Sequence, residues 1–163
     1  MNTDLVAQCR IETPLGPLAL AATARGLAAA LFDAQRHHPG EIDAPVDPRQ
    51  PHLALAAREL ADYFAGRRRQ FTVPLDAAGT NFQHRVWRAL LGIPHGRLGS
   101  YGEVAHRLGQ PNAARAVGAA VGRNPISIIV PCHRVIGRDG SLTGYAGGLA
   151  RKQALLRLEG ALA

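Results

Sequence analysis

The chain has 163 residues, of which 47% are hydrophobic, and its 19 Lys or Arg against 12 Asp or Glu give a formal net charge of +7. This length and composition predict a soluble globular protein with a core of its own, in one ordinary domain or two small ones. No apolar run approaches the ~20 residues that a membrane-spanning helix needs, and the first residues lack the features of a signal peptide, so the sequence predicts a cytoplasmic protein without a membrane partner.

The N-terminal part predicts a small antiparallel sheet followed by a helix. Turn residues separate three short apolar runs, which are typical of a meander of strands over residues 5–11, 18–22 and 27–32. The polar segment 34–51, rich in Pro and His, predicts a surface loop. Apolar residues then recur at helical spacing between 51 and 64, and Gly66 ends the predicted helix.

The run Arg67-Arg68-Arg69 follows this helix directly and has two interpretations. It is either a patch that binds nucleic acid or a solvated helix end whose positive charge complements the helix dipole. The sequence leaves both open.

The composition changes after residues 77–79, which predicts an N-terminal α/β domain (1–78) and a C-terminal domain (79–163). Residues 1–75 hold eight Arg and eight acidic residues, whereas residues 76–163 hold ten Arg, one Lys and four acidic residues, so the whole excess of +7 lies in the second part. This asymmetry favours a polyanion as the partner of the C-terminal domain, nucleic acid before membrane. A general bias towards arginine would have charged both parts.

Three helices are predicted in the first half of the C-terminal domain. Capping-box patterns at Thr80 and Ser100 predict two of them, over residues 80–91 and 100–108. Asn112 is predicted to cap a third, over residues 113–122. A brief turn containing Gly109 joins the last two, which makes them a helix-turn-helix candidate.

The third helix carries small side chains and one long polar one, Arg115. The other DNA-binding candidates are Ala113, Ala114, Ala116 and Gly118 of this helix, together with Tyr101. Readers of the major groove usually carry several Arg, Asn or Gln, so shape-driven binding at the minor groove with one inserted arginine fits this helix better. The alternative is a small-residue helix packed against a neighbour.

Cys132 lies between Pro131 and His133, after the β-branched run 126–130, which predicts a buried strand that ends at the cysteine. A thiolate is the nucleophile, and an ordinary thiol needs a base to ionise it. Residues adjacent in an extended chain point to opposite faces, so a Cys132–His133 pair needs a sharp turn or a bridging water. The alternative is a buried thiol beside a surface histidine.

A base next to the nucleophile also needs an acidic group to orient it, and Asp139 and Glu159 are the candidates downstream. Glu159 ends the predicted final helix (149–159), where a carboxylate is disfavoured by the helix dipole. Arg151, Lys152 and Arg157 are predicted to form the polar positions of this helix. The glycine-rich loop 143–148 before it predicts backbone N–H groups close to a ligand.

The sequence predicts free thiols and no metal site. Cys9, the second cysteine, lies in an apolar alternation and is predicted to be a small buried hydrophobe. Without CxxC motifs or clustered histidines the spacing of metal ligands is absent. No cofactor is predicted.

Taken together, these motifs resemble those of the O6-alkylguanine-DNA alkyltransferases, also called methylated-DNA–protein-cysteine methyltransferases. The resemblance is strong from about Thr80 to Gly160 and weaker in the N-terminal part. The residues that carry it are Pro131-Cys132-His133-Arg134-Val135-Ile136, Arg115, Asn124-Pro125, Tyr145-Ala146-Gly147-Gly148 and Glu159, with Thr13-Pro14-Leu15-Gly16 and Tyr63-Phe64-Ala65-Gly66 in the N-terminal part.

The resemblance implies a fold and a reaction. The fold is α/β (α+β), with a ribonuclease-H-like N-terminal domain (a three-stranded antiparallel sheet with a helix) and a mostly helical, winged-helix-like C-terminal domain. Cys132 would accept the alkyl group from O6-alkylguanine in double-stranded DNA in one irreversible displacement, after the base is flipped out through the minor groove. O4-alkylthymine as a second lesion and cooperative binding by monomers along DNA are left open.

The resemblance also implies roles for single residues. His133, oriented by Glu159, would take the thiol proton through a water. Tyr101 would donate a hydrogen bond to the departing guanine, and Asn124 would be the hinge between the recognition helix and the site. Val135, Tyr145, Ala146 and Gly147 would form the substrate pocket, and Ala146 departs from the serine that some relatives carry. Some relatives hold zinc in the N-terminal domain, but this chain offers only Cys9 there as a sulfur ligand, so no zinc is expected.

Two rival functions remain open. One is a helix-turn-helix DNA-binding regulator or lesion sensor without chemistry. The other is a cysteine hydrolase that uses Cys132 and His133.

Overall fold

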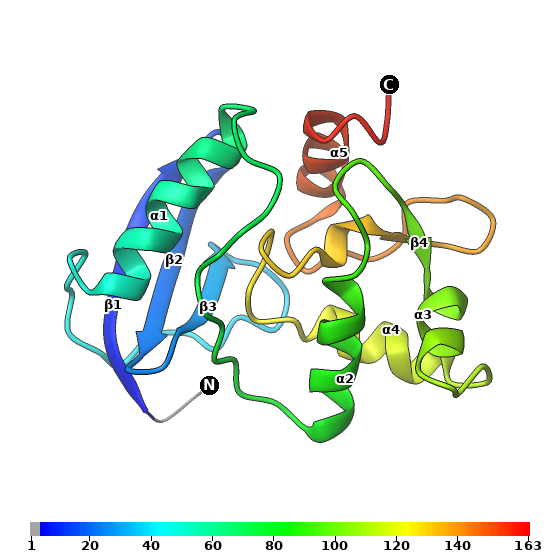
Figure 1. The fold of residues 1–163 in the computed structure, drawn as a ribbon, viewed down its shortest axis with the longest axis horizontal. Helices are drawn as coiled ribbons and strands as arrows, with labels where there is room; N and C mark the ends of the chain where they lie inside the picture. The colour runs from blue at the N-terminus through cyan, green and yellow to red at the C-terminus, as the bar shows by residue number, and fades with distance from the viewer. Residues whose placement is uncertain (1–3) are drawn as a thin grey trace.

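A three-stranded antiparallel sheet with one helix forms the N-terminal lobe of the computed structural model, which describes residues 4–163 (Figure 1). The strands are β1 (Leu5–Thr13), β2 (Gly16–Thr23) and β3 (Leu27–Phe32), in the spatial order β1-β2-β3. The predicted meander is therefore confirmed. Gly16 closes the first hairpin with a φ of 107°, a value that favours glycine.

Helix α1 (Pro51–Phe64) spans the residues of the predicted helix and packs on one face of this sheet (Figure 1). The Gln50 side chain accepts hydrogen bonds from the backbone N–H groups of His52 and Leu53, and Pro51 occupies the first turn, where its missing N–H costs nothing. Leu53 and Leu60 lie on its buried face. Each such aliphatic side chain stabilises the fold by about 1.5–3 kcal/mol.

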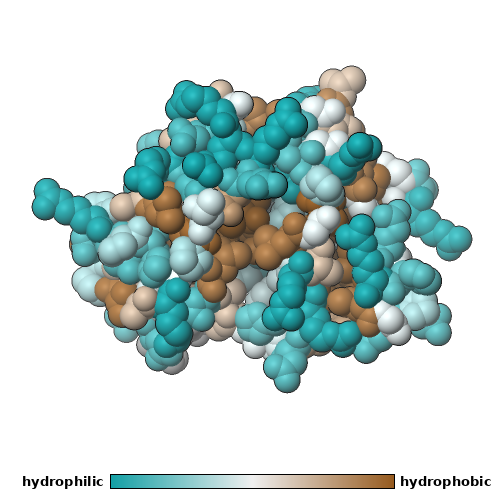
Figure 2. Space-filling model, viewed as in Figure 1, coloured by the Kyte–Doolittle hydropathy of each residue, from teal (hydrophilic) through white to brown (hydrophobic). Residues whose placement is uncertain are grey.

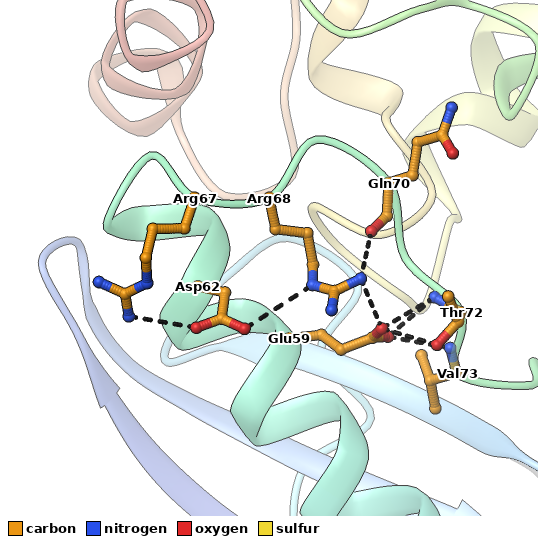
Figure 3. Close-up of polar contacts among 7 residues, drawn as sticks. All are labelled: Glu59, Asp62, Arg67, Arg68, Gln70, Thr72 and Val73. Carbon is orange, nitrogen blue, oxygen red and sulfur yellow. Dashed lines mark hydrogen bonds and ion pairs between the residues drawn. The ribbon is translucent and has the colours of Figure 1, made fainter.

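Two arginines of the run after α1 form ion pairs with acidic residues of that helix (Figure 3). Arg68 Nη1 lies 2.9 Å from Oε2 of the buried Glu59, and Arg67 Nη2 lies 3.1 Å from Asp62 Oδ1. Glu59 also accepts hydrogen bonds from the backbone N–H groups of Thr72 and Val73 at 2.9 Å. Two arginines of the run thus fasten the segment after α1 to the helix, which neither interpretation of the sequence anticipated.

Replacing the buried Glu59 with alanine is expected to destabilise the fold by about 3 kcal/mol, because the N–H groups of Thr72 and Val73 and the guanidinium of Arg68 lose their acceptor. Burial alone would raise the pKa of Glu59, but the hydrogen bonds from Thr72 and Val73 and the charge of Arg68 outweigh it and lower the pKa. Urea unfolding at pH 7 measures the loss. Exposed Glu41→Ala is the control, and an equal loss in both variants would contradict the assignment.

The C-terminal lobe is built mostly from helices and loops (Figure 1). Its elements are α2 (Asn81–Leu90), β4 (Gly99–Ser100), α3 (Tyr101–Arg107), α4 (Ala114–Gly122), a 3₁₀-helix η1 (Cys132–Arg134), β5 (Val135–Ile136) and α5 (Leu149–Leu158). The predicted α/β class is confirmed, with a three-stranded antiparallel sheet at the N-terminus and a helical part after it.

The ends of the predicted helices are confirmed in part. Thr80 and Gln83 form the capping box of α2, and the Ser100 side chain accepts a hydrogen bond from the Glu103 N–H at the start of α3. The predicted Asn112 cap is wrong. Helix α4 begins at Ala114 with Ala113 as N-cap and no side-chain cap hydrogen bond, so packing stabilises its first turn.

The edge of β3 that faces away from β2 is covered by segments from both lobes. The Leu27 N–H donates to the Pro74 carbonyl at 2.8 Å, and the Ala30 N–H donates to the Pro125 carbonyl at 2.9 Å. Gly26 approaches this seam so closely that a Cβ there would lie 2.7 Å from the Pro74 oxygen. The main hydrophobic core is continuous through both lobes.

The buried strand predicted over residues 126–130 is wrong. Ile126 makes a single bridge with Ala30, and the chain then turns, because the Val130 N–H donates back to the Ile126 carbonyl at 3.1 Å. Ile128 has a φ of 74°, which is strained for a β-branched residue. The apolar run is buried as predicted, but in a tight turn.

Residues 34–50 form a loop that is anchored to the sheet rather than free. The Gln8 side chain donates hydrogen bonds to the carbonyls of Ile42 and Ala44, and Ile42 is buried. The Phe32 N–H donates to the buried Gln35 side chain at 2.7 Å. These contacts hold the first part of the loop against the C-terminal lobe, where the Arg36 N–H donates to the Ala146 carbonyl at 2.8 Å.

Apolar residues gather along the middle of the face shown in Figure 2, with polar and charged residues around them. A cavity of about 610 Å³ lies between residues 69–75, 91–95 and 129–134, where the two lobes meet. Within residues 4–163, no helix has the length and apolar character that crossing a membrane would require.

Candidate active site

Cys132 begins the 3₁₀-helix η1, immediately after Pro131, with only 5% of its surface exposed. The predicted position at the end of a strand is therefore wrong. Residues 132–134 form a 3₁₀-helix and not an extended chain, so Cys132 and His133 need not point to opposite faces.

Asn124 holds the turn and the thiol together. Its Nδ2 lies 3.1 Å from Cys132 Sγ and 2.9 Å from the Val130 carbonyl oxygen, while its Oδ1 accepts a hydrogen bond from the Ile126 N–H at 2.9 Å. One buried amide thus fixes the chain on both sides of the turn and places a donor beside the sulfur.

Burial raises the pKa of the Cys132 thiol to about 11, although the Asn124 hydrogen bond and the charge of Lys152 both lower it. The thiol is therefore protonated at neutral pH. A base is needed before the sulfur can act as a nucleophile.

A buried network centred on Glu159 lies beside the cysteine. Oε2 of Glu159 lies 2.8 Å from His133 Nε2 and 3.0 Å from Arg134 Nη2, and it accepts a hydrogen bond from the Tyr63 hydroxyl at 2.6 Å. Oε1 accepts from Arg134 Nε at 2.8 Å. Of the two acidic candidates, the structure brings Glu159 to His133, whereas Asp139 is exposed and bonded to Ser141.

The electrostatics of this network favour a neutral histidine and an ionised glutamate. Burial lowers the pKa of His133, and the hydrogen bond to Glu159 opposes this only in part. Burial would raise the pKa of Glu159, but the hydrogen bonds from His133, Arg134 and Tyr63 lower it far below its usual range. With Nε2–H donated to the carboxylate, Nδ1 carries the lone pair, and it has no hydrogen-bond partner among the described residues.

The thiol lies in the wall of a cavity of about 190 Å³. Tyr101, Gly118, Tyr145 and Ala146 line it as well, together with Arg36 and His37 from the N-terminal lobe and residues 119, 121, 122 and 144. The cavity therefore brings together predicted residues from α3, α4, η1 and the loop 143–148.

Two predicted pocket residues lie behind the cavity wall. The Val135 carbonyl accepts a hydrogen bond from Lys152 Nζ at 2.5 Å. Gly147 packs so closely that a Cβ there would lie 2.7 Å from Cε2 of Tyr145 and 3.2 Å from Cδ2 of Phe32. Any role of Gly147 in the pocket would thus be to allow this close approach.

Lys152 is a site residue that the sequence analysis named only as a polar position of the final helix. It is fully buried, and its Nζ also donates to the Thr143 carbonyl at 2.7 Å. Burial lowers its pKa to about 8, and the nearby Cys132 opposes this change. Lys152 therefore links α5, β5 and the loop 143–148 behind the cysteine. The one signal in the sequence for the burial of Lys152 was the weak amphipathicity of the final helix, which lacks a clearly polar face.

Helix α4 presents one buried face and one exposed face. Val117, Ala120 and Val121 are buried against the lobe, and the Ala120 carbonyl accepts a hydrogen bond from Trp87 Nε1 at 2.8 Å. On the other face Arg115 and Ala116 are exposed, while Ala113, Ala114 and Gly118 are half-buried. The two interpretations of this helix are thus compatible, since one face packs and the other is free to bind.

Tyr101 lies at the first turn of α3, between helix α4 and the cavity that Cys132 lines. It packs against Gly118 of α4, where an added Cβ would lie 3.7 Å from the ring, and its hydroxyl lies 3.5 Å from Thr143 Oγ1. Over the described part of the chain, no cluster of three or more His, Cys, Asp or Glu has the arrangement of a metal site.

Two family models cover most of the chain. The model described as the 6-O-methylguanine DNA methyltransferase ribonuclease-like domain matches residues 10–77, and the DNA binding domain of the same family matches residues 81–161. A methylated-DNA–protein-cysteine methyltransferase of Mycobacterium tuberculosis is 52% identical over 149 residues, which are 91% of this chain and 89% of the relative. One of Methanosarcina acetivorans is 48% identical, over 91% of this chain and 95% of the relative.

A solved structure resembles the fold over nearly its whole length. The crystal structure of Mycobacterium tuberculosis OGT in complex with DNA matches with a TM-score of 0.88 and 49% identity, over 96% of this chain and 94% of that one.

Proposed function

Because the chain belongs to the 6-O-methylguanine DNA methyltransferase family, we propose that it repairs DNA by direct reversal, as a methylated-DNA–protein-cysteine methyltransferase. The substrate is double-stranded DNA that contains O6-alkylguanine, and the acceptor is Cys132. The observation that carries this assignment is the buried thiol in the wall of a 190 Å³ cavity, beside a histidine bonded to an ionised carboxylate.

The reaction is one in-line displacement. Nδ1 of His133 takes the thiol proton through a water, and the sulfur attacks the alkyl carbon. The S–C bond forms as the C–O6 bond breaks, and the electron pair of that bond leaves with the guanine. Tyr101, which lines the cavity, donates a hydrogen bond from its hydroxyl to the departing base. The product is a thioether that no base in the site can expel, so each molecule acts once.

Binding to DNA is assigned to α4 in the C-terminal domain (79–163), and not to the N-terminal domain (1–78). The exposed, small-residue face of α4 lets the backbone approach a groove closely, and Arg115 is its one long polar side chain. Arg115 takes the place of the base that is flipped into the cavity. The protein is proposed to act as a cytoplasmic monomer.

Mass spectrometry after incubation with an O6-methylguanine duplex tests the assignment. The expected result is one added methyl group, stable to washing, on the peptide that contains Cys132. If the protein stays unmodified and still binds DNA, the assignment is wrong and the protein is a DNA-binding regulator. Turnover of an acyl ester by Cys132 would replace it with a hydrolase.

Arg115→Ala is expected to lower the single-turnover rate of transfer on duplex DNA by about tenfold or more, because the extruded base then leaves an unfilled stack. For binding to undamaged DNA, the slope of log K against log[salt] should decrease by at most about one, as expected for the loss of one phosphate contact. Exposed Arg49→Ala is the charge-matched control. Equal rates for both variants would remove the assigned role of Arg115.

A further inference from the structure

The N-terminal lobe contributes one polar side chain to the network that serves the cysteine. Tyr63 lies in the last turn of α1, only 1% exposed, and its hydroxyl donates to Glu159 Oε2 at 2.6 Å. The same oxygen lies 2.8 Å from His133 Nε2. The tyrosine and the histidine therefore share one acceptor atom, although they come from opposite lobes.

The position of this hydroxyl is set by packing on every side of the ring. Tyr63 lies edge-on to Phe64 and to His95, with ring centroids 5.3 and 6.2 Å away, and at a tilted angle to Phe71 at 5.6 Å. Phe71 belongs to the segment that Glu59 and Arg68 fasten to α1 (Figure 3). The packing of the ring thus helps to place the hydroxyl beside Glu159.

We propose that Tyr63 is a positioning residue for alkyl transfer, which acts through Glu159 to set the orientation and basicity of His133. This inference rests on the proposed function of the site. It makes the helix of the N-terminal lobe part of the reaction, because the carboxylate that orients the base is itself held by that helix.

The direction of the effect follows from the sharing of one oxygen. While Tyr63 donates to Glu159, part of the carboxylate charge is taken up by the hydroxyl. Without that donor the carboxylate attracts the proton on His133 Nε2 more strongly, which favours the imidazolium and raises the pKa of His133. The titratable and charged groups that surround His133 and Glu159 are Arg134 and His95, together with Cys132, Tyr145 and Lys152 on the cavity side.

Tyr63→Phe tests the inference, because it keeps the ring and removes only the hydroxyl. The maximal single-turnover rate of methyl transfer should fall by about tenfold, the size expected for one hydrogen bond to a charged group. The acidic limb of the pH–rate profile should move to higher pH, since His133 must be neutral to take the thiol proton. A shift of the same sign should appear when the His133 ring is titrated by NMR without DNA.

Leu53→Val is the matched control, because it loosens the packing of α1 at the end of the helix away from Tyr63 and leaves the hydroxyl and its neighbours in place. It should lower the melting temperature and keep both the rate and the pH profile. If Tyr63→Phe also lowers only the melting temperature, Tyr63 is purely structural and the inference is wrong. The NMR titration needs no substrate, so failure of the proposed reaction in the unmodified protein would be seen separately.

Discussion

Cys132→Ser is expected to abolish methyl transfer while DNA binding stays unchanged. A hydroxyl is far less acidic than a thiol, and the site is buried enough to raise even the pKa of the thiol to about 11. The His133–Glu159 pair therefore cannot generate a useful alkoxide, and the loss should be on the order of 10⁴-fold or more, as for removal of other enzyme nucleophiles. Transfer is measured in single-turnover assays with a labelled methyl group, and binding by fluorescence anisotropy.

Cys9→Ala supplies the comparison, because Cys9 is the other buried cysteine and lies in β1. This variant should still take up one methyl group per molecule. Residual repair by Cys132→Ser, or loss of the adduct in Cys9→Ala, would show that the acceptor is assigned to the wrong residue.

The second large effect is expected for Glu159→Gln, on stability as well as on transfer. The substitution removes the charge that compensates Arg134, whose guanidinium is buried and donates to both oxygens of Glu159. A buried ion pair that loses one partner costs about 3–5 kcal/mol. Urea unfolding at pH 7 measures the loss, and Glu12→Gln on the exposed side of β1 should change stability by about 0.5 kcal/mol or less.

The same variant has a defined dependence on pH. Because the pKa of Glu159 in the folded protein lies below its ordinary value of 4.5, ionised Glu159 contributes its full stability above that pH. The contribution is lost as the pH falls towards the folded-state pKa. The stability difference between the unmodified protein and Glu159→Gln should therefore be constant near neutral pH and shrink in acid. A difference that grows in acid would contradict the assignment.

The sequence predicted those elements whose signals are local. The turn residues between the strands, the capping box at Thr80 and the apolar spacing of α1 each lie within one element, and each was confirmed. The contact between Glu159 and His133 was anticipated because the resemblance named both residues, and the geometry now places them 2.8 Å apart. Their roles in the reaction stay predictions.

The misses have two physical causes, which are a side chain that replaces the partners of the backbone and contact between distant parts of the chain. The run 126–130 has the composition of a strand, yet the Asn124 side chain satisfies its backbone groups and folds it into a turn. In the sequence Lys152 resembles a surface lysine, because the two carbonyl groups that it contacts lie in β5 and in a loop and not in its own helix. Tyr63 and Glu159 are 96 positions apart, so no local pattern could connect them.

The burial of Cys132 has a consequence for chemical selectivity. Because burial raises the pKa of this thiol to about 11, the unassisted thiol is protonated at pH 7. Peroxides and small soluble electrophiles react with thiolates, so they find almost nothing to attack. If each molecule acts only once, as proposed, burial of the thiol keeps it from being spent on the wrong reagent.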